Sequence, residues 1–260
     1  MGSAVIINVD SMQLYRDIPV LSASPDEYMK HSVPHFLYNF LPAESDYNVA
    51  TYIDDVKMVL EKQVDKSMVP ILVGGTGMYI NALLNGIAAV PQVDEELRVH
   101  LREKQAIDGN EELYRELAML DSEMAHKLNR SDSQRILRAL EVVKSTGKSL
   151  LYWQTLPIEK PFSWLRFEVK CLIPPRDLLY RNCNQRLVDL LNHGGIDEVS
   201  RVLERGVSPR ARITSALGFA EVARFLRKEI DYDNMVELAQ TRTRQYAKRQ
   251  CTWFRSLSQL

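Results

Sequence analysis

Two short polar segments follow apolar, strand-like runs, and their residues could carry chemistry. Asp10, Ser11, Met12 and Gln13 follow the β-branched run that begins at residue 4, and the turn Gly74–Gly77 follows residues 69–73. Ligands of parallel α/β sheets bind beyond the carboxyl ends of the strands. A carboxylate there can accept a proton or hold a metal, and glycines let an anion approach backbone N–H groups. A capped turn and a purely structural glycine turn remain the alternatives.

Arginines at two places could contact phosphate. Arg135 and Arg138, which follow Gln134, are spaced i, i+3 on an expected helix and share one face. A solvated face or a salt bridge to Glu141 explains this pair better when no further context is given. Arg186 lies on an expected helix after two prolines, where it could neutralise a leaving diphosphate at the strand ends, or simply lie on the surface.

The C-terminal stretch from residue 241 to residue 260 is basic and aromatic and contains no acidic residue. Phosphate contacts combined with base stacking require this mixture of side chains. An amphipathic terminal helix with a solvated basic face is an equally good explanation. The residues in question are Arg242, Arg244, Tyr246, Lys248, Arg249, Trp253, Phe254 and Arg255.

The spacing of apolar residues predicts the scaffold that positions these segments. Strands at residues 4–10 and 69–73, with helices at 49–63 and 78–84, form the βαβ pattern of a parallel sheet. A third strand is expected at 167–173. The charged stretch between them reads as helices at 95–105, 110–120, 122–128 and 133–145, and the last part of the chain as helices at 177–193, 196–205, 215–228 and 233–256. We expect an α/β core of residues 1–90 and 163–260 and a helical insertion at 91–162.

Composition restricts the class of protein. The 260 residues are 45% hydrophobic and 26% charged, with a net charge of −1, as in globular domains. No apolar run approaches the roughly 18 residues that cross a bilayer, and no signal peptide precedes the first strand, so we expect a cytoplasmic protein without a membrane partner. Cys171, Cys183 and Cys251 lack the spacing of a zinc site, and we expect no bound structural metal.

Taken together, these segments resemble tRNA dimethylallyltransferases, the isopentenyltransferases of the IPP transferase family. The similarity lies in the order and spacing of several blocks and extends over nearly the whole chain. The blocks are residues 10–16, 34–35, 70–86, 134–148, 186–199, 216–219 and 247–255.

The resemblance implies a parallel sheet of P-loop-kinase type with a helical insertion. It also implies transfer of a dimethylallyl group from dimethylallyl diphosphate to N6 of the adenosine on the 3′ side of the tRNA anticodon, assisted by Mg²⁺. In such enzymes Asp10 would accept the amine proton, Thr76 would lie near the diphosphate and the base, and Arg186 would contact the diphosphate. Residues expected to contact the tRNA anticodon arm are Asp10, Ser11, Met12, Gln13, Thr76, Arg98, Gln134, Arg135, Arg138, Gly218, Phe219, Lys248, Arg249, Trp253 and Arg255.

One departure from the family pattern concerns phosphate binding. The family opens with a strand and a G-x-T-x-x-G-K-[ST] loop, but here only Met1, Gly2 and Ser3 precede the first expected strand. We therefore expect a chain that lacks its first strand and P-loop, binds dimethylallyl diphosphate poorly, and exposes apolar side chains of residues 4–10 at the seam.

Two rival functions follow from the same residues. A truncated or degenerate tRNA-binding pseudoenzyme would keep the anticodon-arm surface without prenyl transfer. A prenyltransferase of free adenylate would share the fold, but it would need neither the helical insertion nor the basic C-terminal stretch. The sequence favours the tRNA-prenylating enzyme, and we expect it to be a monomer.

Overall fold

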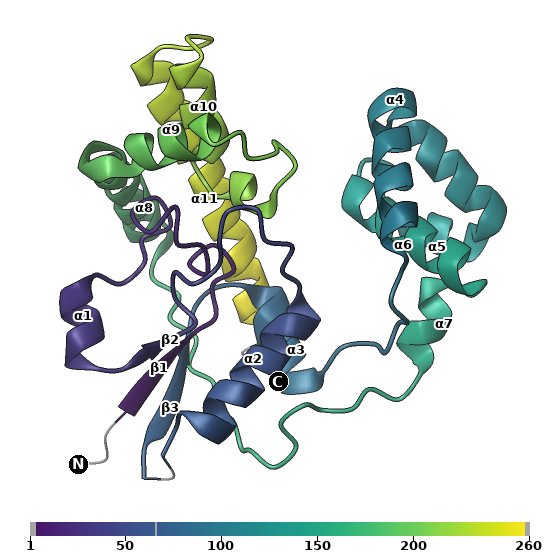
Figure 1. Ribbon diagram of the computed structural model, residues 1–260, viewed down its shortest axis with the longest axis horizontal. Coiled ribbons are helices and arrows are strands. Elements are labelled where there is room, and N and C mark those ends of the chain that lie inside the picture. Colours follow the sequence, from purple (N-terminus) through teal and green to yellow (C-terminus); the bar gives the residue numbers. More distant parts are fainter. Residues whose placement is uncertain (1–3, 66, 258–260) are drawn as a thin grey trace. The chain divides into compact units, whose positions relative to one another are not determined.

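The computed structural model describes residues 4–65 and 67–257 (Figure 1). The residues ahead of the first expected strand and the last three residues of the basic stretch lie outside these ranges. The chain divides into two compact units, one formed by Met1–Leu84 and Pro161–Leu260 and the other by Asn85–Lys160. The sequence placed the insertion at 91–162. None of the described helices is long and apolar enough to cross a membrane.

The core of the larger unit is a parallel sheet of three strands within the described residues, in the order β2-β1-β3. The strands are β1 (Ala4–Asn8), β2 (His35–Phe36) and β3 (Val69–Val73). Ile7 of β1 pairs with Phe36 on one side and with Leu72 on the other. The β-branched side chains of β1 therefore pack in the centre of the sheet, where Ile7 is fully buried. The expected parallel α/β architecture is confirmed.

Helix α2 (Val49–Lys62) lies between β2 and β3 in the sequence, and α3 (Gly77–Asn85) follows β3. The side chain of Asn48 caps α2 by accepting from the N–H groups of Ala50 and Thr51. The fully buried Tyr52 of α2 stacks on Tyr79 of α3, with 4.0 Å between ring centroids. Its hydroxyl donates to the carbonyl oxygen of Asn8 at 2.8 Å, which joins α2 to the end of β1. This polar contact inside the apolar core specifies how the helix sits on the sheet.

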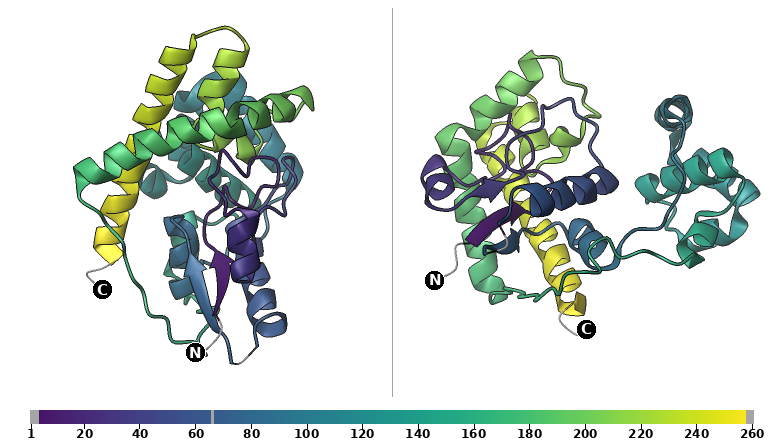
Figure 2. Two further views of the ribbon diagram at one scale, coloured as in Figure 1. Left: turned by 90° about the vertical axis from the view of Figure 1, so that its left-hand side faces the viewer. Right: turned by 60° about the horizontal axis from the view of Figure 1, so that its bottom comes forward.

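The C-terminal part of the larger unit is helical. After α8 (Arg176–Leu190) and a π-turn at Leu191–Gly195 come α9 (Ile196–Glu204), a 3₁₀ turn (Arg212–Ser215) and α10 (Phe219–Leu226). The long α11 (Tyr232–Leu257) packs on α8 and α10. Figure 2 shows α11, in yellow, crossing α8, in green.

The smaller unit is a helical bundle with its own core. It contains α4 (Glu95–Leu120), α5 (Ser122–Lys127), α6 (Ser133–Thr146) and α7 (Leu150–Thr155). The sequence predicted two helices where α4 runs, and Gly109, at φ 80°, bends it between them. Helix α7 was not predicted. The large side chains that are fully buried in this core are Leu101, Leu113, Leu117, Ile136 and Leu140.

Two expectations about strands are wrong. Residues 167–173 form no strand, and Leu172 is 93% exposed, because a strand forms only where a neighbouring strand takes up its backbone hydrogen bonds. The apolar side chains of β1 do not line an exposed seam either. Strand β1 pairs with a neighbouring strand along both of its edges. The exposed apolar side chains of the sheet lie on β3, where Val69 is 57%, Ile71 46% and Val73 46% exposed. The short α1 (Glu27–Ser32) and β2 were not predicted.

We expect Tyr52→Phe to lower the free energy of unfolding by about 1–2 kcal/mol, because it removes a buried hydrogen bond and leaves the ring stacking in place. Urea denaturation measures this loss. Tyr28→Phe is the matched control, since Tyr28 is 82% exposed and should change stability by only a few tenths of that amount. Equal effects of the two substitutions would contradict a structural role for the Tyr52 hydroxyl.

Candidate functional site

The turns that follow β1 and β3 lie side by side, as the sequence predicted. Thr76 Oγ1 accepts a hydrogen bond from the backbone N–H of Ser11 at 3.0 Å and lies 3.3 Å from Ser11 Oγ. The backbone N–H of Thr76 donates to Val9 O at 3.1 Å. These hydrogen bonds fasten the segment that carries Asp10 to the glycine turn, at the carboxyl edge of the sheet.

The Asp10 carboxylate is partly buried at this edge. Burial raises the pKa of the Asp10 carboxyl, while N–H groups of Met12 and Gln13 and the positive charge of Arg186 act in the opposite direction. The hydrogen bond from the Met12 N–H is 2.9 Å long. A carboxylate whose pKa is raised holds a proton more strongly than an exposed aspartate does, so Asp10 is suited to accept a proton from a weakly acidic group.

Gly74 lets the two turns approach closely. A Cβ atom at this position would lie 2.2 Å from the carbonyl carbon of Val9, which is backbone and cannot yield. The glycine turn is therefore needed for the joint between β1 and β3, whatever else it does.

The next glycines of the turn admit side chains of α11. A Cβ on Gly75 would lie 2.3 Å from Gln250 Nε2, and one on Gly77 would lie 2.8 Å from Cδ2 of the Trp253 ring. Gln250 Nε2 also donates to Gly75 O at 2.9 Å. These two glycines therefore leave room for side chains of α11, which packs on the turn.

Two tyrosines lie near Asp10: Tyr246, which the sequence named only within the basic and aromatic stretch, and Tyr38, which the sequence did not name. Burial, and then the charge of Asp10, raises the pKa of the Tyr246 hydroxyl on α11. The same two causes raise the pKa of Tyr38 to about 12. On α11, Tyr246, Gln250 and Trp253 are spaced i, i+4, i+7 and share a face, which is the signal that could have identified Tyr246 and Gln250. No local pattern points to Tyr38, which reaches Asp10 through the fold.

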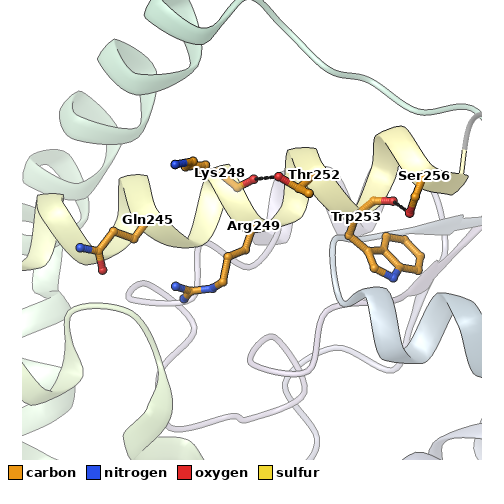
Figure 3. Close-up of a pocket in the computed structure, with 6 residues that line it drawn as sticks. All are labelled: Gln245, Lys248, Arg249, Thr252, Trp253 and Ser256. Carbon is orange, nitrogen blue, oxygen red and sulfur yellow. Dashed lines mark hydrogen bonds between the residues drawn. The ribbon is translucent and has the colours of Figure 1, made fainter. Parts of the chain in front are cut away.

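An open pocket with a volume of about 570 Å³ lies along α11 (Figure 3). Gln245, Arg249 and Trp253 point to the same side of the helix. The guanidinium of Arg249 lies 5.6 Å from the centroid of the Tyr246 ring, and Lys248 and Arg249 are both exposed. Cationic and aromatic groups along one surface suit a polyanion with bases. The lining residues are Gln245, Lys248, Arg249, Thr252, Trp253 and Ser256.

The other predicted residues of the larger unit differ in how accessible they are. Arg186 is exposed on α8 and acts electrostatically on Asp10, and Arg255 is exposed near the end of α11. Met12 is partly buried and packs against the main core. Gly218 adopts a left-handed conformation before α10, and the ring of Phe219 is only 2% exposed. Contrary to the expectation of a tRNA contact, Phe219 fills the core and has no free face for a base.

The four predicted residues of the smaller unit lie on its helices α4 and α6. Arg98 pairs with Glu95, and Arg138 forms the salt bridge to Glu141 that the sequence left open, at 3.3 Å. Gln134 is exposed, and the side chain of Arg135 is 75% exposed while it pairs with Asp132 at 3.4 Å. Arg135 is therefore the most accessible cation of this group.

No group of three or more His, Cys, Asp or Glu side chains in residues 4–65 and 67–257 is arranged to hold a metal ion. At the joined turns the oxygen donors are the Asp10 carboxylate and the hydroxyls of Ser11 and Thr76, which bond to one another or to backbone groups. Of these donors only Asp10 is a carboxylate, so water and phosphate oxygens would have to supply most of the six ligands of a magnesium ion here.

Comparison with known proteins gives one family. The sequence profile of the IPP transferase family matches residues 13–257. A tRNA dimethylallyltransferase of Rickettsia bellii is 41% identical over 250 residues, which cover 96% of this chain and 79% of that protein. A tRNA dimethylallyltransferase of Wolbachia pipientis from Culex pipiens is 36% identical over 251 residues, covering 96% of this chain and 83% of the relative.

Solved structures agree with this assignment. The tRNA isopentenylpyrophosphate transferase of Bacillus halodurans superposes with a TM-score of 0.62 at 26% identity, over 97% of this chain and 78% of that one. A eukaryotic dimethylallyltransferase acting on tRNA gives a TM-score of 0.75 at 25% identity, over 96% of this chain and 63% of that one. Sequence and fold therefore lead to the same conclusion: the chain belongs to the IPP transferase family.

Proposed function

We infer that this chain is a tRNA dimethylallyltransferase, an enzyme that transfers a dimethylallyl group to tRNA. The observation that carries this function is the joint at the carboxyl edge of the sheet. There the partly buried Asp10, the Thr76 turn and the basic, aromatic face of α11 meet. Family membership favours this enzyme over a tRNA-binding protein without prenyl transfer.

We propose that the acceptor is N6 of the adenosine on the 3′ side of the anticodon and the donor is dimethylallyl diphosphate. A bond forms between N6 and C1 of the dimethylallyl group, and the bond from C1 to the diphosphate oxygen breaks. The Asp10 carboxylate takes the proton that the amine loses, so that the nitrogen is nucleophilic when C1 becomes electron-poor. The diphosphate leaves with the bonding electron pair, and the charge of Arg186 stabilises it.

Magnesium, in our proposal, comes with the substrate. Mg²⁺ in phosphate-transferring sites takes its ligands from one or two protein carboxylates, the phosphates and water, and it neutralises the charge of the diphosphate. Because Asp10 is the one carboxylate among the described oxygen donors at the joined turns, we propose that the ion arrives bound to dimethylallyl diphosphate. Since tRNA is the substrate, we place the reaction in the cytoplasm.

Asp10→Asn should lower the turnover number for tRNA prenylation by roughly 10²–10⁴-fold, because the amide cannot accept the amine proton. The dissociation constant for tRNA should change little, since the amide oxygen can still accept from the Met12 N–H. Single-turnover assays and filter binding measure the two quantities. Asp54→Asn, at an exposed position on α2, is the control and should leave both unchanged. An equal loss of tRNA binding in Asp10→Asn would assign Asp10 a structural role instead.

The raised pKa of Asp10 also gives a pH dependence to stability. The folded state holds the Asp10 proton more strongly than the unfolded chain, whose carboxyl titrates near 3.8. In wild type, the contribution of Asp10 to the free energy of unfolding is therefore fully present below pH 3.8. This contribution is lost as the pH rises through the pKa of Asp10 in the folded state. Asp10→Asn removes this loss, so the variant should gain stability relative to wild type as the pH rises above about 4. Urea unfolding at several pH values tests the sign, and a gain that shrinks with pH would contradict it.

Binding of tRNA should depend on Lys248 and Arg249 and weaken steeply with salt. The slope of log affinity against log salt concentration should become shallower by about 0.7–0.9 for each phosphate interaction that is removed, hence by one or two such steps in a Lys248→Ala/Arg249→Ala variant. In Arg135→Ala/Arg138→Ala the change should be smaller, because Arg138 already pairs with Glu141. Lys57→Ala/Lys62→Ala on α2 removes two exposed charges as a control. Identical slopes in all four proteins would exclude α11 as the phosphate-binding face.

A further inference from the structure

A buried carboxylate outside the proposed site holds a loop by its backbone. Glu198 of α9 is 3% exposed. Its Oε1 accepts from the N–H of Val20 and its Oε2 from the N–H of Leu21, each at 2.8 Å. Burial raises the pKa of the Glu198 carboxyl, and the two N–H groups oppose that shift. Both oxygens of this buried carboxylate therefore hold the backbone of one loop in a fixed position.

The same loop is fixed from other directions. The side chain of Leu21 is buried and packs near Gly195 and Gly218, where added Cβ atoms would approach it to 3.5 and 3.4 Å. Ala23 adopts a positive φ of 53°, a strained conformation for a residue with a side chain. Such a conformation persists only where the surroundings determine it, and the clamp from Glu198 lies two residues away.

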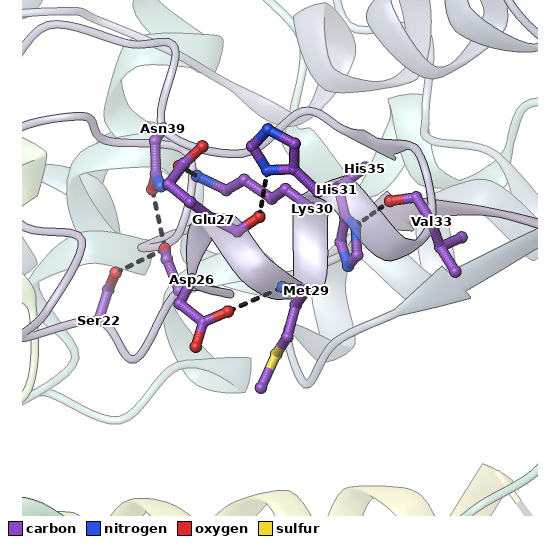
Figure 4. A network of polar contacts seen from close by, with 10 residues as sticks. Ser22, Asp26, Glu27, Met29, Lys30, His31, Val33, His35 and Asn39 are labelled. Atoms are coloured by element: carbon purple, nitrogen blue, oxygen red, sulfur yellow. Dashed lines mark hydrogen bonds and ion pairs between the residues drawn. The ribbon is translucent and has the colours of Figure 1, made fainter.

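The loop in turn holds Gln13. Gln13 Nε2 donates to Ser22 O at 3.1 Å and to Ala23 O at 2.8 Å, so both side-chain N–H groups are used within the protein. Gln13 O accepts from the N–H of Asn39 at 2.9 Å. The Asn39 side chain lies 2.8 Å from Ser24 Oγ, within the polar network that Figure 4 shows beside α1. The loop of residues 20–23 therefore fixes the side chain of Gln13, and Asn39, which follows β2, fixes its backbone carbonyl group.

Gln13 stands next to the proposed proton acceptor. The backbone N–H groups of Met12 and Gln13 both act on the Asp10 carboxylate, and the Met12 hydrogen bond is 2.9 Å long. A shift of Gln13 would move these donors and let the carboxylate turn. The contacts thus form a continuous path from Glu198 through the 20–23 loop and Gln13 to Asp10.

We propose that Glu198 is a positioning residue for prenyl transfer, which fixes the Asp10 carboxylate through the 20–23 loop and Gln13. Its consequence for catalysis rests on the proposed function, whereas its effect on the Asp10 segment does not. Gln13 then has an internal role as the connecting link, where the sequence suggested a contact with tRNA. The alternative is that Glu198 only adds stability to the fold.

The test variant is Glu198→Gln, which keeps the size of the side chain. One amide oxygen can still accept from a backbone N–H, but the NH₂ group then faces the other N–H and cannot bond to it. Glu204→Gln is the matched control on the same helix, since Glu204 is exposed and bonds only to Ser200 among the hydrogen bonds described. Val59→Ala on α2 is a second control, because Val59 is 3% exposed in the main core and its truncation destabilises the fold without touching the path.

Hydrogen–deuterium exchange of the intact chain is the readout that needs no enzymatic activity. In Glu198→Gln we expect backbone amides of residues 10–16 and 18–24 to exchange roughly tenfold faster than in wild type, beyond the change seen in Val59→Ala. Glu204→Gln should behave as wild type. Faster exchange in residues 18–24 alone, with residues 10–16 unchanged, would overturn the proposal, because the clamp would then end at the loop.

A double-mutant cycle on turnover tests the path to Asp10. Glu198→Gln should lower the turnover number roughly 10–100-fold with little change in the KM for tRNA, since misplacement of a reacting group affects the chemical step. Gln13→Ala should have a similar effect, and the double variant should be no slower than Gln13→Ala alone. Multiplicative losses would show independent roles and overturn the proposal. If wild type shows no prenyl transfer, the proposed function fails while the exchange experiment still decides the positioning role.

Discussion

The parallel pairing of β1 with β3 is the constraint on which the rest of the site depends. Because the two strands run in the same direction, the polar segments that follow them emerge at one edge of the sheet. Gly74 allows the backbones to meet there, and the Thr76 hydroxyl bonds to the N–H of Ser11 across the joint. Ser11 and Thr76, which are far apart in the sequence, are thereby held next to each other.

Helix α11 packs against the glycine turn at this edge. Gln250 and Trp253 occupy the space that the glycines of the turn leave free, and Tyr246 lies close enough for Asp10 to perturb its hydroxyl. The same helix presents Lys248 and Arg249 to solvent. One element therefore brings a tyrosine near the carboxylate and also offers exposed cations to a polyanion. Burial raises the pKa of the Asp10 carboxyl, which makes the carboxylate more basic at some cost in stability.

Carboxylates serve two different purposes in the larger unit. Asp10 keeps a reactive position at the strand end, whereas Glu198 uses both oxygens to hold backbone N–H groups of a loop that lies far from it in sequence. A buried carboxylate that accepts two such bonds satisfies its own hydrogen-bonding needs and those of the loop at once. Connections of this kind allow irregular segments, such as the strained turn at Ala23, to carry a site with defined geometry.

The sequence by itself determined the regular elements and the chemistry of the strand ends. Apolar periodicity predicted β1, β3, α2 and most of the later helices, since burial on one face imposes that pattern locally. The adjacency of Asp10 and Thr76 followed from the parallel order of two strands. Only the tertiary structure decided which candidates are accessible: Phe219 lies in the core, Arg138 pairs with Glu141, and residues 167–173 form no strand for want of a partner. Tyr38 comes near Asp10, and Glu198 reaches the loop of residues 20–23, through contacts between distant segments. Local spacing cannot encode these contacts because they depend on how whole elements pack.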